Sequence, residues 1–286
     1  AESAPDSFIP SQLRVESWEG VQPYFEELLS REINSLDAFH TWLRNRSELD
    51  AVLQEDLGWR YIRQTCDTGD ERKKDALHFF LREIEPHLAE YSDKLNRKML
   101  ELPYPEQLRE EKYKVYFRAV RKETEIFRQE NIALLTEAQT LANEYGQILG
   151  AMSVNLEGKE LTLQQAAIYL KEINRSVREE AYVKINQRRL DDKDTLDDLF
   201  DKLLALRNQI AVQAGKANFR DYMFDALGRF DYTAADCEAF HSSVKEFILP
   251  LIEKFEAIRK QKLGYEALYP WDLEVDPDLK KPLKPF

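Results

Sequence analysis

Glycine and proline are absent from three long stretches of this chain, residues 24–57, 106–145 and 159–214. These two residue types are the main interruptions of helices, because glycine costs backbone entropy and proline lacks the N–H that a helix needs. Charged residues, many of them good helix formers, make up 33% of the 286 residues, a composition that favours helix over sheet or disorder. We therefore expect a mainly all-α fold, a multi-helix array with a sizeable core.

Apolar side chains recur at helical spacing between residues 196 and 214, which predicts one buried stripe on a helix. Arg207 interrupts that stripe, and we expect it to pair with an acid where two helices pack. Gly215 follows the last apolar residue, at the place where a left-handed residue commonly ends a helix. Residues 216–222 are then an ordered corner that leads into another helix.

A second periodic segment, residues 240–258, contains Pro250, and we expect a kinked helix there because proline removes one backbone donor. Helix starts are predicted where a Ser or Thr precedes an acid or Gln by three residues, the spacing of a capping box. Five pairs have this spacing: Ser47 with Asp50, Thr162 with Gln165, Ser176 with Glu179, Thr195 with Asp198, and Thr233 with Asp236.

Two segments depart from the helical pattern. Val154 and Leu156 alternate with polar residues before Gly158, which predicts one small β-hairpin over residues 153–162. Residues 269–286 contain four prolines, and we expect an extended connector there because proline fixes the backbone in an extended form.

Charge and composition exclude several classes of partner. With 41 basic and 53 acidic residues, the net charge of −12 repels phosphate backbones, so nucleic acid is not expected as a partner. No uncharged apolar run approaches the roughly 18 residues of a membrane span, so no membrane partner is expected. Cys66 and Cys237 lie far apart without metal-site spacing. They are expected to pack in the core of a reduced, cytoplasmic protein.

The chain lacks the residues of a hydrolytic metal centre. A catalytic zinc needs three protein ligands and an open position for water, often supplied in part by HExxH on a helix, and that motif is absent. His87 and Glu90 lie one turn apart and form at most half a site, so ordinary core or surface histidines are the better reading. The chain also lacks GxSxG, GxGxxG and a Walker sequence. We expect neither catalytic residues nor metal ligands in it.

The stretch LRNQIAVQAGKANFRDYMF, residues 206–224, is the most distinctive local pattern. On physical grounds Asn218, Arg220 and Tyr222 form a structural brace, because polar corner residues satisfy exposed backbone groups. Arg207 on the preceding helix is also able to grip a peptide carboxylate. These four side chains are the candidates for a binding surface.

That stretch resembles the start of the peptidase domain in oligoendopeptidase F and its thimet-type relatives, a family of zinc oligopeptidases. Further segments resemble the same family in the same order: SREINSLDAFHTWLRNRSELDAVLQEDLGWRYIRQTCDT, NIALLTEAQTLANEYGQILGAMSVNLEGKELTLQQ, NRSVREEAY, GRFDYTAADCEAF and LYPWDL. The resemblance covers nearly the whole chain. In that family the HExxH helix comes well after the WDL segment, so the chain is similar to the part that precedes the zinc site.

The resemblance implies residues 1–190 as a helical amino-terminal, lid-like domain and residues 191–286 as the first helices and connector of the peptidase domain. It implies that these helices form one wall and lid of a channel for short peptides, with Arg207, Asn218, Arg220 and Tyr222 as candidate wall residues. Zinc would be held by a missing carboxyl-terminal catalytic half. Without that half the chain would be inactive, and exposed apolar surface would favour self-association. The alternative is a standalone, non-enzymatic helical interaction module on a peptidase-like scaffold.

Overall fold

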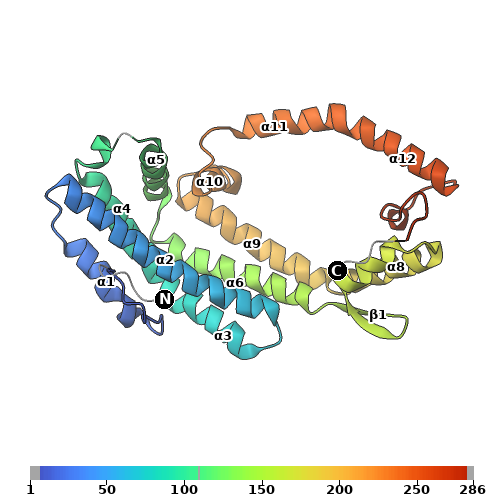
Figure 1. Cartoon of the computed structure of the whole chain (residues 1–286), viewed down its shortest axis with the longest axis horizontal. Helices are drawn as coiled ribbons and strands as arrows, with labels where there is room; N and C mark the ends of the chain where they lie inside the picture. Colours follow the sequence, from blue (N-terminus) through green and yellow to red (C-terminus); the bar gives the residue numbers. More distant parts are fainter. Residues whose placement is uncertain (1–6, 109, 282–286) are drawn as a thin grey trace. The chain divides into compact units, whose positions relative to one another are not determined.

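The structure, a computed structural model, describes residues 7–108 and 110–281 (Figure 1). It divides into two compact units, each built from two separate segments of the chain. The first unit comprises the chain up to Asn143 together with residues 203–230, and the second comprises residues 144–202 together with the chain from Asp231 onward. Helices dominate both units, and the single sheet in the described part has two strands. The predicted mainly all-α fold is confirmed.

The first unit is a set of helices around an aromatic core. Phe25, Phe39 and Trp42 are fully enclosed, and the Trp42 indole Nε1–H donates to the Leu28 carbonyl at 2.9 Å. A smaller cluster around Ile126, in which Tyr222 also packs, completes the unit. Its elements are α1 (Trp18–Ser30), α2 (Leu36–Cys66), α3 (Glu71–Phe79), the π turn η1 (Phe80–Ile84), α4 (Glu85–Glu101), the 3-10 turn η2 (Pro105–Gln107), α5 (Glu111–Ile126), α10 (Phe219–Ala226), and the parts of α6 (Asn131–Gly150) and α9 (Lys193–Gln213) that fall within it.

The second unit has its own core under a hairpin. Strands β1 (Ser153–Leu156) and β2 (Lys159–Thr162) pair antiparallel, with Ser153 opposite Thr162 and Leu156 opposite Lys159. Glu157 and Gly158 turn the chain with φ of 52° and 77°, the positive values of a tight hairpin turn. The predicted hairpin is confirmed. The other elements are α7 (Leu163–Ala167), η3 (Ile168–Lys171), α8 (Arg175–Asp191), α11 (Ala234–Ser243), η4 (Val244–Ile248), α12 (Leu249–Leu263) and η5 (Pro270–Asp272).

Two of the five predicted helix starts are confirmed as reciprocal capping boxes, Thr162 with Gln165 and Thr233 with Asp236. The other three are wrong, because spacing alone does not reveal a cap that lies further upstream. Helix α2 already begins after Ser35, α8 begins after Asn174, and α9 begins at Lys193, so Ser47, Ser176 and Thr195 lie inside helices.

The segment with Pro250 is helical, and its pattern changes to a π turn just before the proline. The predicted kink stays a prediction. Residues 244–248 of η4 join α11 to α12, and Pro250 is the second residue of α12, where its missing N–H costs least. Figure 1 shows α11 and α12 as one continuous helical run. The large apolar side chains of this run are exposed: Phe240, Phe247, Ile248, Leu249, Leu251, Ile252, Phe255 and Ile258.

The structure corrects the predictions for the two cysteines and for the carboxyl-terminal tail. Cys66 is exposed at the end of α2, while Cys237 is half-buried and both are free thiols. The segment after Tyr269 is folded as well as extended, because Pro270 begins a 3-10 turn and the side chains of Asp272 and Val275 are fully buried. Pro282 and Pro285 lie outside the described residues. No helix in the described ranges has both the length and the apolar character to cross a bilayer.

Candidate functional site

The predicted corner between α9 and α10 is ordered by backbone and side-chain hydrogen bonds. Gly215 has φ of 77°, and the Lys216 N–H donates to the Ala211 carbonyl at 2.9 Å, which closes the end of α9. Asn218 then caps α10, because its side-chain oxygen accepts from the Asp221 N–H at 3.0 Å. The Arg220 Nε donates to the Asp221 carboxylate at 2.9 Å. These contacts give the corner the geometry of a structural brace.

Arg207 does not have the predicted acid partner. Instead, among the described residues, its guanidinium lies over the Phe219 ring at 5.5 Å from the centroid. The prediction was wrong because α10 presents an aromatic ring to α9 at this point, and a guanidinium is stabilised by the face of a ring as well as by a carboxylate. Of the four candidate residues, Tyr222 alone is buried, whereas the Arg220 side chain is exposed.

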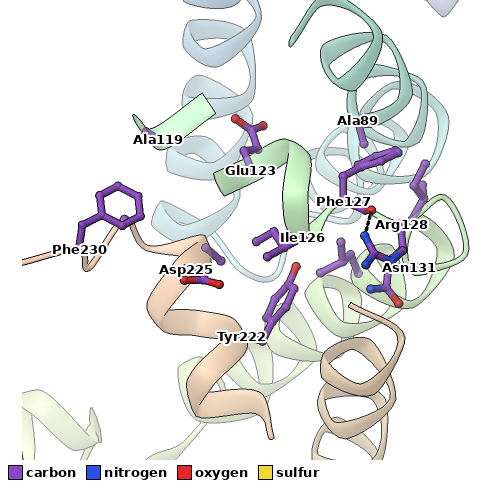
Figure 2. A pocket seen from close by; sticks show the side chains of 14 residues that line it. Ala89, Ala119, Glu123, Ile126, Phe127, Arg128, Asn131, Tyr222, Asp225 and Phe230 are labelled. Atoms are coloured by element: carbon purple, nitrogen blue, oxygen red, sulfur yellow. Dashed lines mark hydrogen bonds between the residues drawn. The ribbon is translucent and has the colours of Figure 1, made fainter. Parts of the chain in front are cut away.

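Tyr222 lines a cavity of about 340 Å³ inside the first unit. Figure 2 shows its ring rising from α10 towards Ile126, with Phe127, Arg128 and Asn131 on one side and Asp225 and Phe230 on the other. The remaining lining residues are Ala89, Ala119, Glu123, Ile132, Leu135, Ala226 and Gly228. Residues from α4, α5, α6 and α10 therefore enclose one largely apolar space, and of the four candidate residues only Tyr222 lines it.

Two charged residues of the cavity lining, Asp225 and Arg128, have partners in the protein. Asp225 pairs with the Lys216 Nζ at 2.5 Å, and the Arg128 Nη1 donates to the Glu125 and Phe127 carbonyls. Burial raises the pKa of the Glu123 carboxyl above its usual range, although the charge of Arg46 and the Asn96 side chain oppose the shift. Burial likewise raises the pKa of the Tyr222 phenol. Tyr222 is therefore a neutral phenol near pH 7.

A second polar cluster lies in the second unit and was missed at the level of the sequence. Arg178 is completely buried, and its five N–H donors are all used: on the carbonyls of Glu172, Ile173 and Trp271, on the Tyr265 hydroxyl and on the Asp272 carboxylate. Asp272 in turn accepts from Arg178 at 2.9 Å, from Arg175 at 3.1 and 2.7 Å, and from the Tyr269 N–H at 3.0 Å. We call Arg175, Arg178 and Asp272 the clasp.

The clasp fastens the WDL segment to α8, and its charges are mutually satisfied. Burial of Asp272 raises the pKa of its carboxyl, but hydrogen bonds from Arg175, Tyr269 and Arg178 outweigh that effect and hold the pKa below its usual range. Because each oxygen of Asp272 already accepts two hydrogen bonds, the cluster leaves no open position for a ligand. The clasp is structural.

The described residues do not fit a zinc site. They contain no grouping of three or more His, Cys, Asp or Glu side chains that is able to hold a metal ion. His87, which lies one turn from Glu90, stacks on the Trp18 ring with centroids 4.8 Å apart. This contact agrees with the expectation of an ordinary histidine. No chemical step is therefore assigned to a metal held by this part of the chain.

Comparison with known proteins places the fold. Residues 9–127 match the family model of the peptidase M3 N-terminal domain, and residues 168–285 match that of peptidase family M3. No curated protein sequence matches the chain.

Three solved structures share the fold over nearly the whole chain. A 3.1 Å X-ray structure of an oligoendopeptidase F has 26% identity and a TM-score of 0.88, covering 95% of this chain and 48% of that one. An oligoendopeptidase F from Bacillus anthracis has 22% identity and a TM-score of 0.85, covering 96% and 50%. PZ peptidase A with an inhibitor has 23% identity and a TM-score of 0.88, covering 95% and 49%.

The chain thus spans about half the length of these structures. Its two matches to the family occur in the order N-terminal domain, then peptidase domain, and between them they take in most of the described helices. The chain belongs to peptidase family M3 and carries that family's N-terminal domain.

Proposed function

We propose that this chain is the amino-terminal portion of a zinc-dependent oligopeptidase, which forms one wall and lid of a channel for short peptides. The observation that carries the proposal is the pair of family matches on a chain that covers about half of each related structure. Zinc, the base and the oxyanion donors would come from a carboxyl-terminal half, because the described residues group no set of metal ligands. Within this scheme residues 1–190 are the lid-like domain and residues 191–286 begin the peptidase domain.

The exposed apolar side chains of the run from α11 to α12 support the proposal that another part of the protein covers this run. Phe247 and Phe255 expose 63% and 67% of their area, and six further large apolar residues of the run expose between 44% and 66%. Contiguous apolar surface of this kind is rare on a complete monomer and marks an interaction site. We propose that the carboxyl-terminal half covers it, and that Arg207, Asn218, Arg220 and Tyr222 belong to the channel wall.

Peptide cleavage tests the proposal. The chain alone and the chain joined to the sequence that follows Phe286 in its gene are assayed with a quenched fluorescent peptide and zinc. We expect turnover by the joined protein only, abolished by a chelator and restored by zinc. Chelator-sensitive turnover by the chain alone would contradict the proposal, as would a reading frame past Phe286 that stops at once. The latter result favours the alternative, a non-enzymatic interaction module.

A further inference from the structure

The cavity that Tyr222 lines has the features of a ligand site. Its volume of about 340 Å³ falls within the range of small-molecule pockets. A dry cavity of about 150 Å³ already accepts benzene, so this one has room for an aromatic side chain and an adjoining peptide group. The walls contributed by Ile126, Phe127, Ile132, Leu135 and Phe230 are apolar and suit such a group.

Some polar atoms of the cavity lining lack partners among the described residues: the Tyr222 hydroxyl forms no hydrogen bond, and the buried Asn131 Oδ1 accepts none. Tyr222 is only 8% exposed, and its ring stacks on Phe219 with centroids 5.8 Å apart, which holds the side chain in place. Buried side-chain polar atoms normally have a hydrogen-bond partner. Because the ring lines the cavity, a ligand there is able to supply the missing acceptor.

The charges around the cavity favour a neutral ligand. Glu123, Arg128 and Asp225 are the charged residues of its lining. Asp225 pairs with Lys216 and Arg128 donates to two backbone carbonyls, while burial raises the pKa of the Glu123 carboxyl and so favours its neutral form. A charged ligand would therefore lose its hydration without gaining a free counter-charge. A peptide segment is neutral, carries carbonyl acceptors and has apolar side chains.

We propose that this cavity binds one apolar, preferably aromatic, side chain of a peptide, with the Tyr222 hydroxyl donating to the adjacent peptide carbonyl. The choice of a peptide as ligand rests on the proposed function, whereas the apolar and neutral character of the site rests on the cavity itself. No bond is made or broken there.

Binding to the chain as it stands tests the site without any hydrolysis. The probe is N-acetyl-4-fluorophenylalaninamide, and its fluorine NMR signal is followed as protein is added. We expect saturable binding with a Kd of about 1 mM or tighter. N-acetylleucinamide displaces the probe and N-acetylserinamide does not, because the serine side chain fills no apolar space. Absence of saturable binding, or displacement by the serine compound at equal concentration, would overturn the proposal.

Variants assign the binding to this cavity. Tyr222→Phe keeps the ring and removes the hydroxyl, and we expect binding about 3- to 10-fold weaker. Ala89→Leu fills the cavity from α4 and abolishes binding, and Ala119→Leu fills it from α5 if the first variant fails to fold by circular dichroism. Tyr145→Phe, on an exposed tyrosine outside the cavity, leaves binding unchanged. Unaltered affinity in the folded Ala89→Leu or Ala119→Leu protein contradicts the site, and unaltered affinity in Tyr222→Phe contradicts the hydrogen bond.

These results are independent of the cleavage assay. Peptide binding that persists while the joined protein fails to cleave peptides defeats the proposed function and leaves the site intact. Cleavage by the joined protein, with no binding of the probe to the chain, defeats the site alone.

Discussion

At the scale of single residues, the most consequential side chains are charges enclosed by the protein. Arg178 and Asp272 are both fully buried. Arg178 donates five hydrogen bonds, one of them to Asp272, and Asp272 accepts four in all. Such pairs contribute little net stability over apolar packing, but removal of one partner leaves the other charge buried with fewer compensating contacts. The clasp therefore makes the folding of the WDL segment depend on α8.

Replacement of Arg178 by Leu removes the partner of Asp272 and leaves its carboxylate with Arg175 and one backbone N–H. We expect a loss of about 3–5 kcal/mol in the free energy of unfolding, measured by urea unfolding and circular dichroism. Arg189→Leu is the matched control, because Arg189 is an exposed arginine of the same helix, and its effect is expected to stay within about 0.5 kcal/mol. Equal effects of the two substitutions would show that the clasp is unimportant for stability.

The pKa of the Glu85 carboxyl is raised in the folded protein, whereas that of Asp272 is lowered. Burial alone raises the pKa of the Glu85 carboxyl, and its Oε2 is enclosed without a hydrogen-bond partner among the described residues. The folded state favours the protonated form, so the stability that Glu85 contributes is fully present below the ordinary pKa of glutamate. It is lost as the pH rises through the higher pKa of the folded state.

We therefore expect Glu85→Gln to stabilise the protein by about 1 kcal/mol at pH 7, since the amide cannot ionise. The gain disappears near pH 4, where the wild-type carboxyl is itself protonated. Thermal unfolding at both pH values measures the difference, with Glu83→Gln, an exposed acid of the same segment, as the control. A gain that is equal at both pH values would contradict the role of ionisation.

At the scale of elements, local sequence patterns predicted correctly those features that depend on interactions between nearby residues. The hairpin at residues 153–162, the left-handed Gly215 and two capping boxes all depend on neighbours within a few residues, and all are present. The burial of Asp272 depends on contacts with α8, almost 100 residues earlier in the chain. The sequence carried a signal in Arg178 and the WDL segment, but no local rule connects them.

The run from α11 to α12 differs most between the burial that its sequence predicts and the exposure that the structure shows. Its apolar spacing predicts a buried helix, yet in this chain its large side chains are exposed. We expect the isolated chain to self-associate in light scattering as its concentration rises. The double variant Phe247→Ser, Phe255→Ser restores a monomer without loss of helix.

The control for this loss of self-association is the double variant Val183→Ser, Leu190→Ser. It removes two exposed apolar side chains from α8 instead. This control is expected to associate like the wild type. A wild-type chain that stays monomeric at all concentrations would count against an uncovered surface.

At the scale of the whole molecule, the fold class and the family followed from the sequence, whereas the candidate site followed only in part. Tyr222 was named among four candidates because of its place in the corner. The cavity around it was not predicted, since Glu123, Phe127 and Leu135 come from other helices and have no pattern that points to a shared space. A cavity forms where the packed side chains of several elements leave space. The spacing of residues within one segment does not predict how distant segments pack.

Amide hydrogen exchange along residues 244–258 tests the central proposal, that a carboxyl-terminal half completes this protein. In the isolated chain these amides are expected to exchange rapidly, because a helix with an exposed apolar face opens easily. In the chain joined to the sequence that follows Phe286, we predict exchange slower by on the order of 100-fold, because packing must be broken before the helix opens. Equal exchange in the two proteins would mean that nothing covers this surface, and would contradict the account.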